Sequence, residues 1–361
     1  MKDNYLIIMA GGVGSRFWPM SKSSYPKQFH DVLGNGKTLL QLTAERFNKI
    51  CPEENVFIVS NQKYKSIIEE QLPFLDNSQI LLEPCMRNTA PCIAYAAYKI
   101  NAKNPNAKLI IAPSDHLIIK QDAFEETIKN ALKQTHKGDY LMTIGIKPHR
   151  PDTGYGYIQY KDGFEGINSS IKYINTFTEK PPKEKAIEFI SSGDYYWNSG
   201  MFIWSVKSII HSFKKHLPEI HRSFDAISKF YFTKNEATSI NEIYHNCENI
   251  SIDIGIMEKA ENALVILADL VWSDLGTWGS LYEQIEKDTN ENAIIADKII
   301  NYNSANNIIM VPKNKLVVTQ GLNDFIVVEN NNMLLICKKE DEQSIKEIVK
   351  AVGEKYGDEY I

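Results

Sequence analysis

The 361-residue sequence is poor in cysteine, with five residues scattered along the chain at Cys51, Cys85, Cys92, Cys247 and Cys337. No two of them form a Cys-x-x-Cys pair, so neither a thiolate zinc site nor a dithiol redox motif is indicated. An odd number of widely spaced cysteines is typical of reduced, buried thiols. We therefore expect no disulfide framework.

Long hydrophobic runs and an excess of basic charge are also missing. The first apolar run, residues 6–10, stops at Gly11-Gly12 and is too short for a signal-peptide core, and no later segment approaches the length of a membrane span. The net charge of -5 argues against a nucleic-acid backbone as the main partner. We expect a cytoplasmic protein that binds neither membranes nor nucleic acid, with any phosphate site confined to a local cluster.

The sequence does contain a regular alternation of apolar, strand-like runs with helix-like segments, which is typical of an α/β fold. Several runs are apolar throughout, as in strands covered by helices on both faces. We predict a mixed, mostly parallel sheet with strands at 6–10, 56–60, 80–82, 109–112, 141–144, 202–204 and 264–267. The stretch 218–248 is predicted to be helical, with its aromatic residues in the core.

After about residue 288 the pattern changes to short β-rich pieces at 308–311, 316–319, 325–328 and 333–337, separated by turns rich in Asn and Gly. We predict two domains, a catalytic domain at 1–287 and a small β domain with a terminal helix at 288–361. Small β domains rarely bury enough surface alone, so we expect this one to support a homodimer.

A glycine-rich loop follows the first predicted strand, in the order Gly11-Gly12-Val13-Gly14-Ser15-Arg16. Glycines at this position let backbone N–H groups approach phosphate oxygens closely. The dinucleotide fingerprint is disfavoured because Phe17 stands where its third glycine is needed. The later segment 34–38 ends like a P-loop, but Asp31 replaces the required first glycine. A turn followed by a helix start at Thr38 is expected there.

Together with Pro26-Lys27-Gln28, this loop resembles the N-terminal signature of the sugar-phosphate nucleotidyltransferase family. The resemblance implies a Rossmann-like, GT-A-like domain and a left-handed β-helix-like C-terminal domain. It also implies that Gly11, Gly12, Gly14, Ser15 and Arg16 bind the nucleotide, with Arg16 and Lys27 as catalytic residues at the reacting phosphates. The alternatives to these roles are that the glycines form an ordinary turn and that Lys27 is a solvated surface lysine.

Residues 83–91 resemble the guanylyltransferase branch of this family and imply a second group of nucleotide-binding residues: Glu83, Arg87, Asn88 and Thr89, with Ser114 further along the chain. Local chemistry offers another interpretation. Asn88 or Thr89 can cap a helix that has Pro91 in its first turn. Both interpretations can hold together, because ligand groups often lie at helix starts.

Blocks at 152–158, 177–181 and 197–202 resemble the sugar-phosphate side of the family. They imply as sugar-phosphate ligands Tyr155, Gly156, Glu179, Lys180, Asn198 and Gly200. By the same resemblance Asp115 and Asp274 are the Mg²⁺ ligands, the alternative being that both are turn or cap aspartates. One departure, Ile254-Gly255-Ile256, leaves the packing there in question.

The resemblance implies a mannose-1-phosphate guanylyltransferase reaction, in which GTP and α-D-mannose 1-phosphate give GDP-mannose and pyrophosphate. A sugar phosphate is already anionic at neutral pH, so its attack on the α-phosphorus needs no general base. A different pair, such as glucose 1-phosphate with UTP or dTTP, and a non-catalytic sugar-nucleotide sensor remain alternatives. Because the chain ends at residue 361, we expect it to lack the isomerase domain that longer family members carry.

Overall fold

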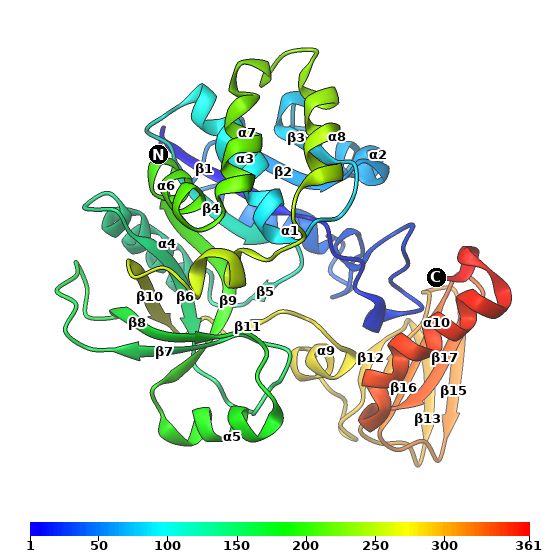
Figure 1. The fold of residues 1–361 in the computed structure, drawn as a ribbon. Coiled ribbons are helices and arrows are strands. Elements are labelled where there is room, and N and C mark those ends of the chain that lie inside the picture. The colour runs from blue at the N-terminus through cyan, green and yellow to red at the C-terminus, as the bar shows by residue number, and fades with distance from the viewer. The chain divides into compact units, whose positions relative to one another are not determined.

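The computed structural model describes residues 1–361 and divides them into two compact units (Figure 1). Unit 1 contains Met1–Gly11, Thr43–Ser114 and Ile118–Trp272, and unit 2 contains Gly12–Leu42, Asp115–Leu117 and Ser273–Ile361. The glycine-rich loop therefore belongs almost entirely to the same unit as the C-terminal part of the chain. The domain boundary predicted at 287/288 stays a prediction.

Unit 1 is built on a nine-stranded sheet with the order β3-β2-β1-β4-β9-β6-β10-β8-β7. Its strands are β1 (Asn4–Met9), β2 (Val56–Asn61), β3 (Ile80–Glu83), β4 (Lys108–Pro113), β6 (Leu141–Ile146), β7 (Tyr157–Lys161), β8 (Ile171–Thr178), β9 (Tyr195–Ser205) and β10 (Ala263–Ala268). The sheet is mixed, as predicted. It is parallel from β3 to β4 and between β6 and β10, and antiparallel where β9, β8 and β7 pair.

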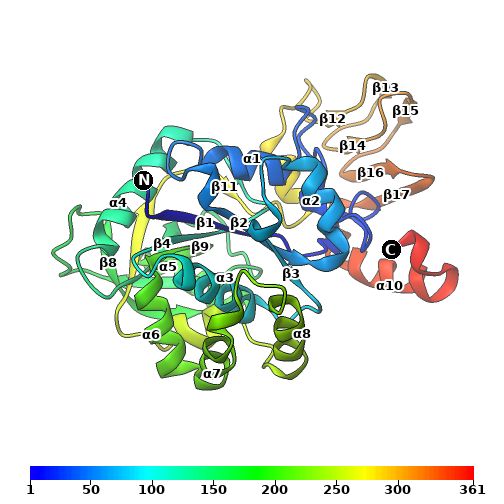
Figure 2. The ribbon, with the colours of Figure 1, turned by 90° about the horizontal axis from the view of Figure 1, so that it is seen from above.

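Helices cover both faces of this sheet: α3, α6, α7 and α8 lie on one side and α4 on the other (Figure 2). The helices up to α8 are α1 (Leu39–Arg46), α2 (Lys65–Gln71), α3 (Thr89–Lys103), α4 (Gln121–Thr135), α5 (Lys183–Ser192), α6 (Val206–His216), α7 (Pro218–Ala226) and α8 (Glu236–Asn246). Burial on both faces explains why β1 and β6 are apolar almost throughout.

Two sequence predictions are refined by these helices. The stretch 218–248 forms two helices, α7 and α8, because a turn intervenes in which Asn235 N–H bonds the Thr233 hydroxyl oxygen. At Thr38 the predicted helix start is confirmed. The Thr38 hydroxyl oxygen accepts from Gln41 N–H, and the Gln41 side-chain oxygen accepts from Thr38 N–H. These two hydrogen bonds cap α1.

Unit 2 contains a β-helix-like stack of short strands: β12 (Ala293–Ile295), β13 (Lys298–Tyr302), β14 (Ile308–Met310), β15 (Leu316–Gln320), β16 (Phe325–Asn330) and β17 (Met333–Lys338). β12, β14 and β16 pair in parallel, β13 pairs in parallel with β15, and β17 closes the larger sheet antiparallel to β16. The predicted small β region is thus confirmed as a stack of parallel rungs.

Buried asparagines hold successive rungs of this stack in register. The side-chain amide of Asn292 donates to the Ser304 carbonyl, and its own oxygen accepts from the backbone N–H and the amide of Asn307. Asn307 passes the pattern on, because its oxygen accepts from Phe325 N–H. Both asparagines are fully buried, so these bonds satisfy polar groups that would otherwise be costly.

Two helices complete unit 2, α9 (Trp278–Gln284) and α10 (Ile345–Tyr356), the latter close to the predicted final helix. One hydrophobic core joins them to the β stack and to the loop after β1, through Phe17, Trp18, Trp278, Val328 and Ile345. Two further short strands, β5 (Leu117–Ile118) and β11 (Trp272–Ser273), form a two-stranded sheet of their own. No helix of the protein is both long and apolar enough to cross a bilayer.

Candidate active site

The glycine-rich loop turns sharply at Gly14, whose φ of +69° is a left-handed conformation that favours glycine. A Cβ atom at Gly14 would also lie 2.9 Å from Cβ of Lys27, so the loop and the lysine segment need this glycine to approach each other. The short 3-10 helix η1 (Ser15–Phe17) follows and carries Arg16. The Nε atom of Arg16 is buried without a hydrogen-bond partner, a state that a bound anion would relieve.

Lys27 is almost fully buried, at 3% exposure, yet it carries an ammonium group. Its Nζ atom lies 2.9 Å from Asp115 Oδ2 and donates to the carbonyl oxygens of Asp274 and Leu275 at 3.0 and 2.7 Å. The same ammonium group lies over the Phe17 ring, 5.2 Å from its centroid. The structure therefore brings together three predicted residues, Lys27, Asp115 and the main chain of Asp274.

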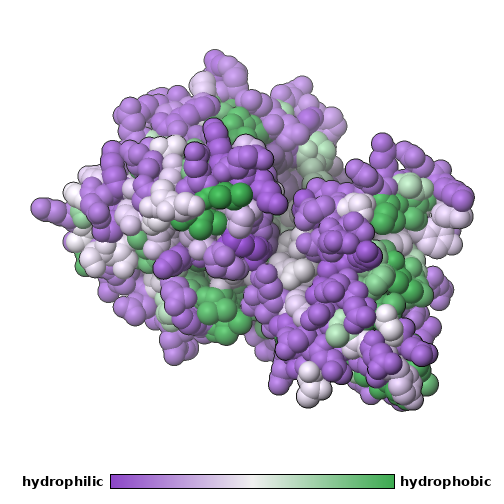
Figure 3. All heavy atoms as spheres, turned by 90° about the horizontal axis from the view of Figure 1, so that it is seen from below, coloured by the Kyte–Doolittle hydropathy of each residue, from purple (hydrophilic) through white to green (hydrophobic).

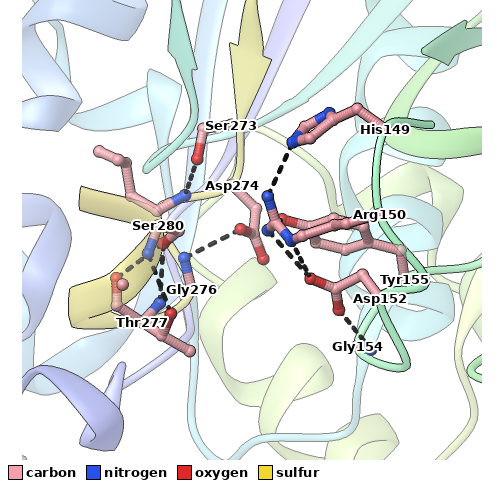
Figure 4. A network of polar contacts seen from close by, with 12 residues as sticks. His149, Arg150, Asp152, Gly154, Tyr155, Ser273, Asp274, Gly276, Thr277 and Ser280 are labelled. Carbon is pink, nitrogen blue, oxygen red and sulfur yellow. Dashed lines mark hydrogen bonds and ion pairs between the residues drawn. The ribbon is translucent and has the colours of Figure 1, made fainter. Parts of the chain in front are cut away.

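Electrostatics keep Asp115 ionised. Burial alone would raise its pKa, but the charges of Lys27 and His116 outweigh burial and hold the pKa of Asp115 below its usual value. Asp274 is ordered locally, because its Oδ1 atom accepts from Gly276 N–H at 2.9 Å, and Thr277 and Ser280 cap the following helix α9 (Figure 4).

Members of the nucleotidyltransferase class generally act with a divalent metal ion, and the donors present fit a magnesium ion. Two carboxylates, Asp115 and Asp274, belong to the same unit, and Lys27 contacts one of them and the backbone of the other. No group of three or more His, Cys, Asp or Glu side chains forms a closed metal site in the protein. This donor set suits Mg²⁺, which keeps several waters and binds through one or two carboxylates plus phosphate oxygens.

Glu83, a predicted nucleotide-binding residue of unit 1, lies at the end of β3 and is 5% exposed. The Tyr244 hydroxyl donates to its Oε1 atom at 2.9 Å, and a Cβ atom at Gly11 would lie 3.8 Å from its Oε2 atom. Burial raises the pKa of Glu83 to about 7, although the Tyr244 bond acts in the opposite direction. Glu83 is therefore an oriented carboxylate beside the start of the glycine loop.

The next predicted nucleotide-binding residues along the chain are held by residues in and around α8. Arg87 donates through Nε to the Tyr244 carbonyl at 2.7 Å and through a terminal nitrogen to the His245 carbonyl, so its guanidinium caps the C-terminus of α8. Thr89 accepts from Ile252 N–H through its hydroxyl oxygen. The capping interpretation of Asn88 is confirmed, since its side chain accepts from Thr89 N–H at the start of α3.

On the predicted sugar side, Gly156 makes room for Glu179. A Cβ atom at Gly156 would lie only 2.6 Å from Glu179 Oε2, so a glycine is required for the carboxylate to take its place. Tyr155 packs edge-on against Trp197 and Trp272, with centroids 4.9 and 5.2 Å away. Lys180 pairs with Glu179, and its backbone N–H donates to the Tyr155 carbonyl.

Both the oxygen and the nitrogen of the Asn198 side-chain amide form hydrogen bonds within the protein. Its oxygen accepts from the Thr143 hydroxyl at 2.8 Å and from Gly200 N–H at 3.2 Å, and its nitrogen donates to Asp253 Oδ1 at 2.9 Å. Gly200 has a φ of +70°. Ser114, which is buried, accepts from the Thr43 hydroxyl through its carbonyl. Asn198 thus orients Asp253.

Asp253 and Arg150 are two residues of this region that sequence reasoning left without a role. Burial and the nearby charge of Glu179 raise the pKa of Asp253 to about 7. Arg150 pairs with Asp152 at 3.0 Å (Figure 4). The Arg150 guanidinium also lies over the Trp197 ring, 5.6 Å from its centroid. Asp253 directly precedes the Ile254-Gly255-Ile256 departure, so the sequence contained a signal nearby. Arg150 had no signal beyond its position two residues before Asp152.

The Ile254-Gly255-Ile256 departure has a packing explanation. Residues 253–257 form a single π-helical turn, and a Cβ atom at Gly255 would lie 2.8 Å from Leu217 Cδ1. A side chain at position 255 would therefore displace the Leu217 side chain from its present packing.

Three features define a Rossmann-like nucleotidyltransferase enzyme: a helix-covered α/β sheet with a glycine-rich loop, a buried lysine paired with a carboxylate, and a β-helix-like unit. Residues 5–291 match the family model described as nucleotidyl transferase, and residues 297–352 match the mannose-phosphate isomerase/GMP-like β-helix domain. The chain belongs to the nucleotidyl transferase family.

Similar proteins and structures support this family membership. "Mannose-1-phosphate guanylyltransferase 2" of Escherichia coli O157:H7 is 35% identical over 366 residues, covering 98% of this chain and 74% of the relative. The crystal structure named "mannose-1-phosphate geranyltransferase" of Thermus thermophilus is 28% identical, with a TM-score of 0.87 over 97% of this chain and 99% of that one. A structure named "mannose-6-phosphate isomerase" of Helicobacter pylori is also 28% identical, with a TM-score of 0.60 over 75% of this chain and 99% of that one.

Proposed function

We propose that this protein transfers GMP from GTP to α-D-mannose 1-phosphate, giving GDP-mannose and pyrophosphate. The observation that carries the proposal is the buried Lys27, held between the Asp115 carboxylate and the Asp274 carbonyl beside a glycine-rich loop. Such a constellation is suited to polyphosphate, whose oxygens are negatively charged and gain further charge as pyrophosphate leaves. The guanylyltransferase name of the E. coli relative supports the choice of substrates.

The chemistry needs alignment and charge neutralisation more than proton transfer. The phosphate oxygen of the sugar phosphate is already anionic and attacks the α-phosphorus in line, while pyrophosphate leaves. We assign Arg16 and Lys27 to the triphosphate, with the main-chain N–H groups of Gly11, Gly12, Gly14 and Ser15 around it. Positioned cations and donors of this kind commonly supply several kcal/mol of barrier reduction, about 3 kcal/mol for each donor removed.

Magnesium, held by Asp115 and Asp274, would neutralise phosphate oxygens when bound. Asp115 stays ionised because Lys27 and His116 outweigh its burial and lower its pKa, so it is ready to serve as a ligand near neutral pH. Lys27 keeps the carboxylate oriented and is itself close enough to meet the same phosphates.

Base selection is assigned to the segment that begins at Glu83. Guanine presents two neighbouring donors, N1–H and the N2 amino group, and a carboxylate can accept from both. Uracil and thymine have one such N–H, flanked by carbonyl oxygens that a carboxylate would repel. The Tyr244 hydroxyl fixes one oxygen of Glu83, which limits the positions this carboxylate can take. Arg87, Asn88, Thr89 and Ser114 complete the proposed nucleotide side.

Sugar recognition is assigned to Tyr155, Gly156, Glu179, Lys180 and Gly200, and Asn198 supports this side by orienting Asp253. Glu179 can accept from neighbouring hydroxyls, because Gly156 leaves space beside its Oε2 atom. Lys180 is 62% exposed and paired with Glu179, so its amine can neutralise the sugar phosphate without first breaking a buried contact.

A pyrophosphate-release assay with a matrix of GTP, ATP, UTP and dTTP against mannose 1-phosphate and glucose 1-phosphate tests the proposal. We expect the GTP and mannose 1-phosphate pair to be fastest, EDTA to abolish turnover and Mg²⁺ to restore it. A clear preference for UTP or dTTP would assign the enzyme to another sugar nucleotide. Binding of GTP with no turnover of any pair would identify a sensor instead.

A further inference from the structure

The loop that carries Arg16 and Lys27 is held by the last residues of the chain. Three of its side chains donate to three consecutive main-chain carbonyls: Trp18 Nε1 to Tyr360 (2.7 Å), Lys22 Nζ to Glu359 (3.1 Å) and Ser23 Oγ to Ile361 (2.8 Å). These carbonyls belong to or adjoin the short 3-10 helix η9 (Asp358–Tyr360). All these residues lie in unit 2.

A second anchor holds the same stretch of the loop from the β stack. The side-chain amide of Asn330, at the end of β16, donates to the carbonyls of Pro19 and Met20 at 3.1 and 3.2 Å. Trp18 itself is only 7% exposed and belongs to the hydrophobic core of unit 2, which also contains Leu335 and Ile345. The backbone between Trp18 and Met20 is therefore fixed on both sides.

Helix α10 connects these anchors to the candidate catalytic residues. It packs against η9 and also against η1, which contains Arg16. Phe17, between Arg16 and Trp18, contacts the Trp278 ring with centroids 4.7 Å apart and lies under the Lys27 ammonium group. A shift of Trp18 would therefore also move Arg16, which lies two residues earlier, and Lys27, whose ammonium group lies over Phe17.

We propose that Trp18 is a positioning residue for the nucleotide phosphates, held by residues 359–361 and supported by Asn330, so that the C-terminal segment preorganises Arg16 and Lys27. This inference rests on the proposed roles of those two residues in binding GTP. Groups fixed before the substrate arrives lose less conformational freedom on binding, so the benefit appears in nucleotide affinity and in turnover. Affinity for the sugar phosphate should depend little on this arrangement.

The test uses three variants of the full chain. Trp18→Phe keeps an aromatic ring but removes the indole N–H, Ser23→Ala removes one hydroxyl, and Asn330→Ala removes the amide that bonds Pro19 and Met20. Thr319→Val is the matched control, because it removes a buried hydroxyl whose hydrogen bond goes to Asn301 within the same β stack. Each variant is measured for KM and kcat with each substrate and for affinity by GTP titration.

A loop-specific readout that does not depend on activity is limited trypsin digestion, with cleavage after Lys22 and Lys27 followed by mass spectrometry. We expect Trp18→Phe and Asn330→Ala each to weaken GTP binding by about fivefold, as the loss of one or two net hydrogen bonds implies. Cleavage in the loop should be faster, and KM for mannose 1-phosphate should be unchanged. Thr319→Val should lower the melting temperature without either effect.

The outcomes separate the two proposals. Faster cleavage with unchanged GTP affinity would overturn the positioning role, and so would unchanged cleavage in all three variants. An equal loss of GTP affinity in Thr319→Val would also overturn it, because general destabilisation would then explain the result. If the wild-type protein binds no GTP, the positioning proposal fails together with the proposed function, whereas an active wild type with unaffected variants rejects the positioning alone.

Discussion

Lys27 is a lysine whose burial makes sense only in terms of its neighbours. An ammonium group at 3% exposure is costly unless it is paired, and Asp115 with two carbonyl oxygens supplies that pairing. The alternative of a solvated lysine is therefore excluded for this residue. The same charge that stabilises the site in the free protein is available to phosphate oxygens.

We predict that Lys27→Met lowers kcat by about 100-fold to 1,000-fold, the range typical of a lost contact to developing charge. It should also lower the melting temperature, because the Asp115 carboxylate would lose its partner. The double variant Lys27→Met with Asp115→Asn should regain stability but not turnover. Turnover of Lys27→Met close to that of the wild type would remove Lys27 from the mechanism.

The raised pKa of Asp253 predicts how the free energy of unfolding depends on pH. Its pKa is raised to about 7 by burial and by Glu179, so the native protein keeps a proton that an unfolded carboxyl loses near pH 4. The native state then binds more protons than the unfolded state between about pH 4 and pH 7, and the free energy of unfolding falls as pH rises through this range. Asp253→Asn should flatten this slope in denaturant titrations at several pH values.

Glu83 has the same sign of pKa shift, so Asp253→Asn should reduce the slope without abolishing it. Asn198→Asp is a useful companion, because it would place a second carboxylate where an amide now donates to Asp253 Oδ1. A slope identical to that of the wild type in Asp253→Asn would show that this carboxyl does not retain its proton.

At the level of elements, α8 and the chain after it form a scaffold for the segment 83–89. Arg87 caps α8, Tyr244 on α8 orients Glu83, and Ile252 N–H bonds Thr89. A cation at a helix C-terminus is favourable both through its hydrogen bonds and through the helix dipole. Arg87 is thus tied to the protein and can act on the nucleotide through the position of its neighbours.

We predict that Arg87→Met lowers the free energy of unfolding by about 1–2 kcal/mol, since two hydrogen bonds to carbonyls are lost. KM for GTP should rise several-fold, and KM for mannose 1-phosphate should stay the same. Arg87→Lys keeps the charge but loses the geometry that pairs with two carbonyls. Its stability and its KM for GTP should therefore lie between those of the wild type and those of Arg87→Met. Reduced stability with normal KM for GTP would limit Arg87 to a structural role.

For the whole molecule, the β stack of unit 2 leaves apolar side chains in solvent. On the β13–β15 ladder, Ile300 and Val318 occupy paired positions and are 45% and 56% exposed, and Leu316 is 64% exposed. Leu334 and Ile336 are similarly exposed on β17. Figure 3 shows apolar patches on the part of the surface that this unit forms, at the right of the view.

We predict that this surface mediates a homodimer. Clusters of exposed apolar residues of this kind mark association surfaces in many proteins. Light scattering at micromolar concentration should give twice the chain mass, and Val318→Glu should give the monomer with an unchanged circular dichroism spectrum. Lys298→Glu, on the same ladder but at a charged position, serves as the control. A wild-type monomer at this concentration would contradict the prediction.

The sequence by itself determined the α/β class, the glycine-rich loop and the β stack. Continuous apolar strands, turn residues and the N-cap at Asn88 are local signals, and each acts over a few residues. The ordered motifs also indicated the family. The sequence places Gly156 and Glu179 in two separate motifs, and it does not show that these two residues meet.

Tertiary structure alone decided which of these residues meet. Lys27 and Asp115 pair across almost ninety positions of sequence, Asn198 turns to Asp253, and the loop after β1 is fixed by residues 359–361. No local pattern encodes such contacts, because they depend on how distant segments pack into one core. Asn198 looked free to bind a sugar in the sequence, and only the fold shows both ends of its amide already engaged.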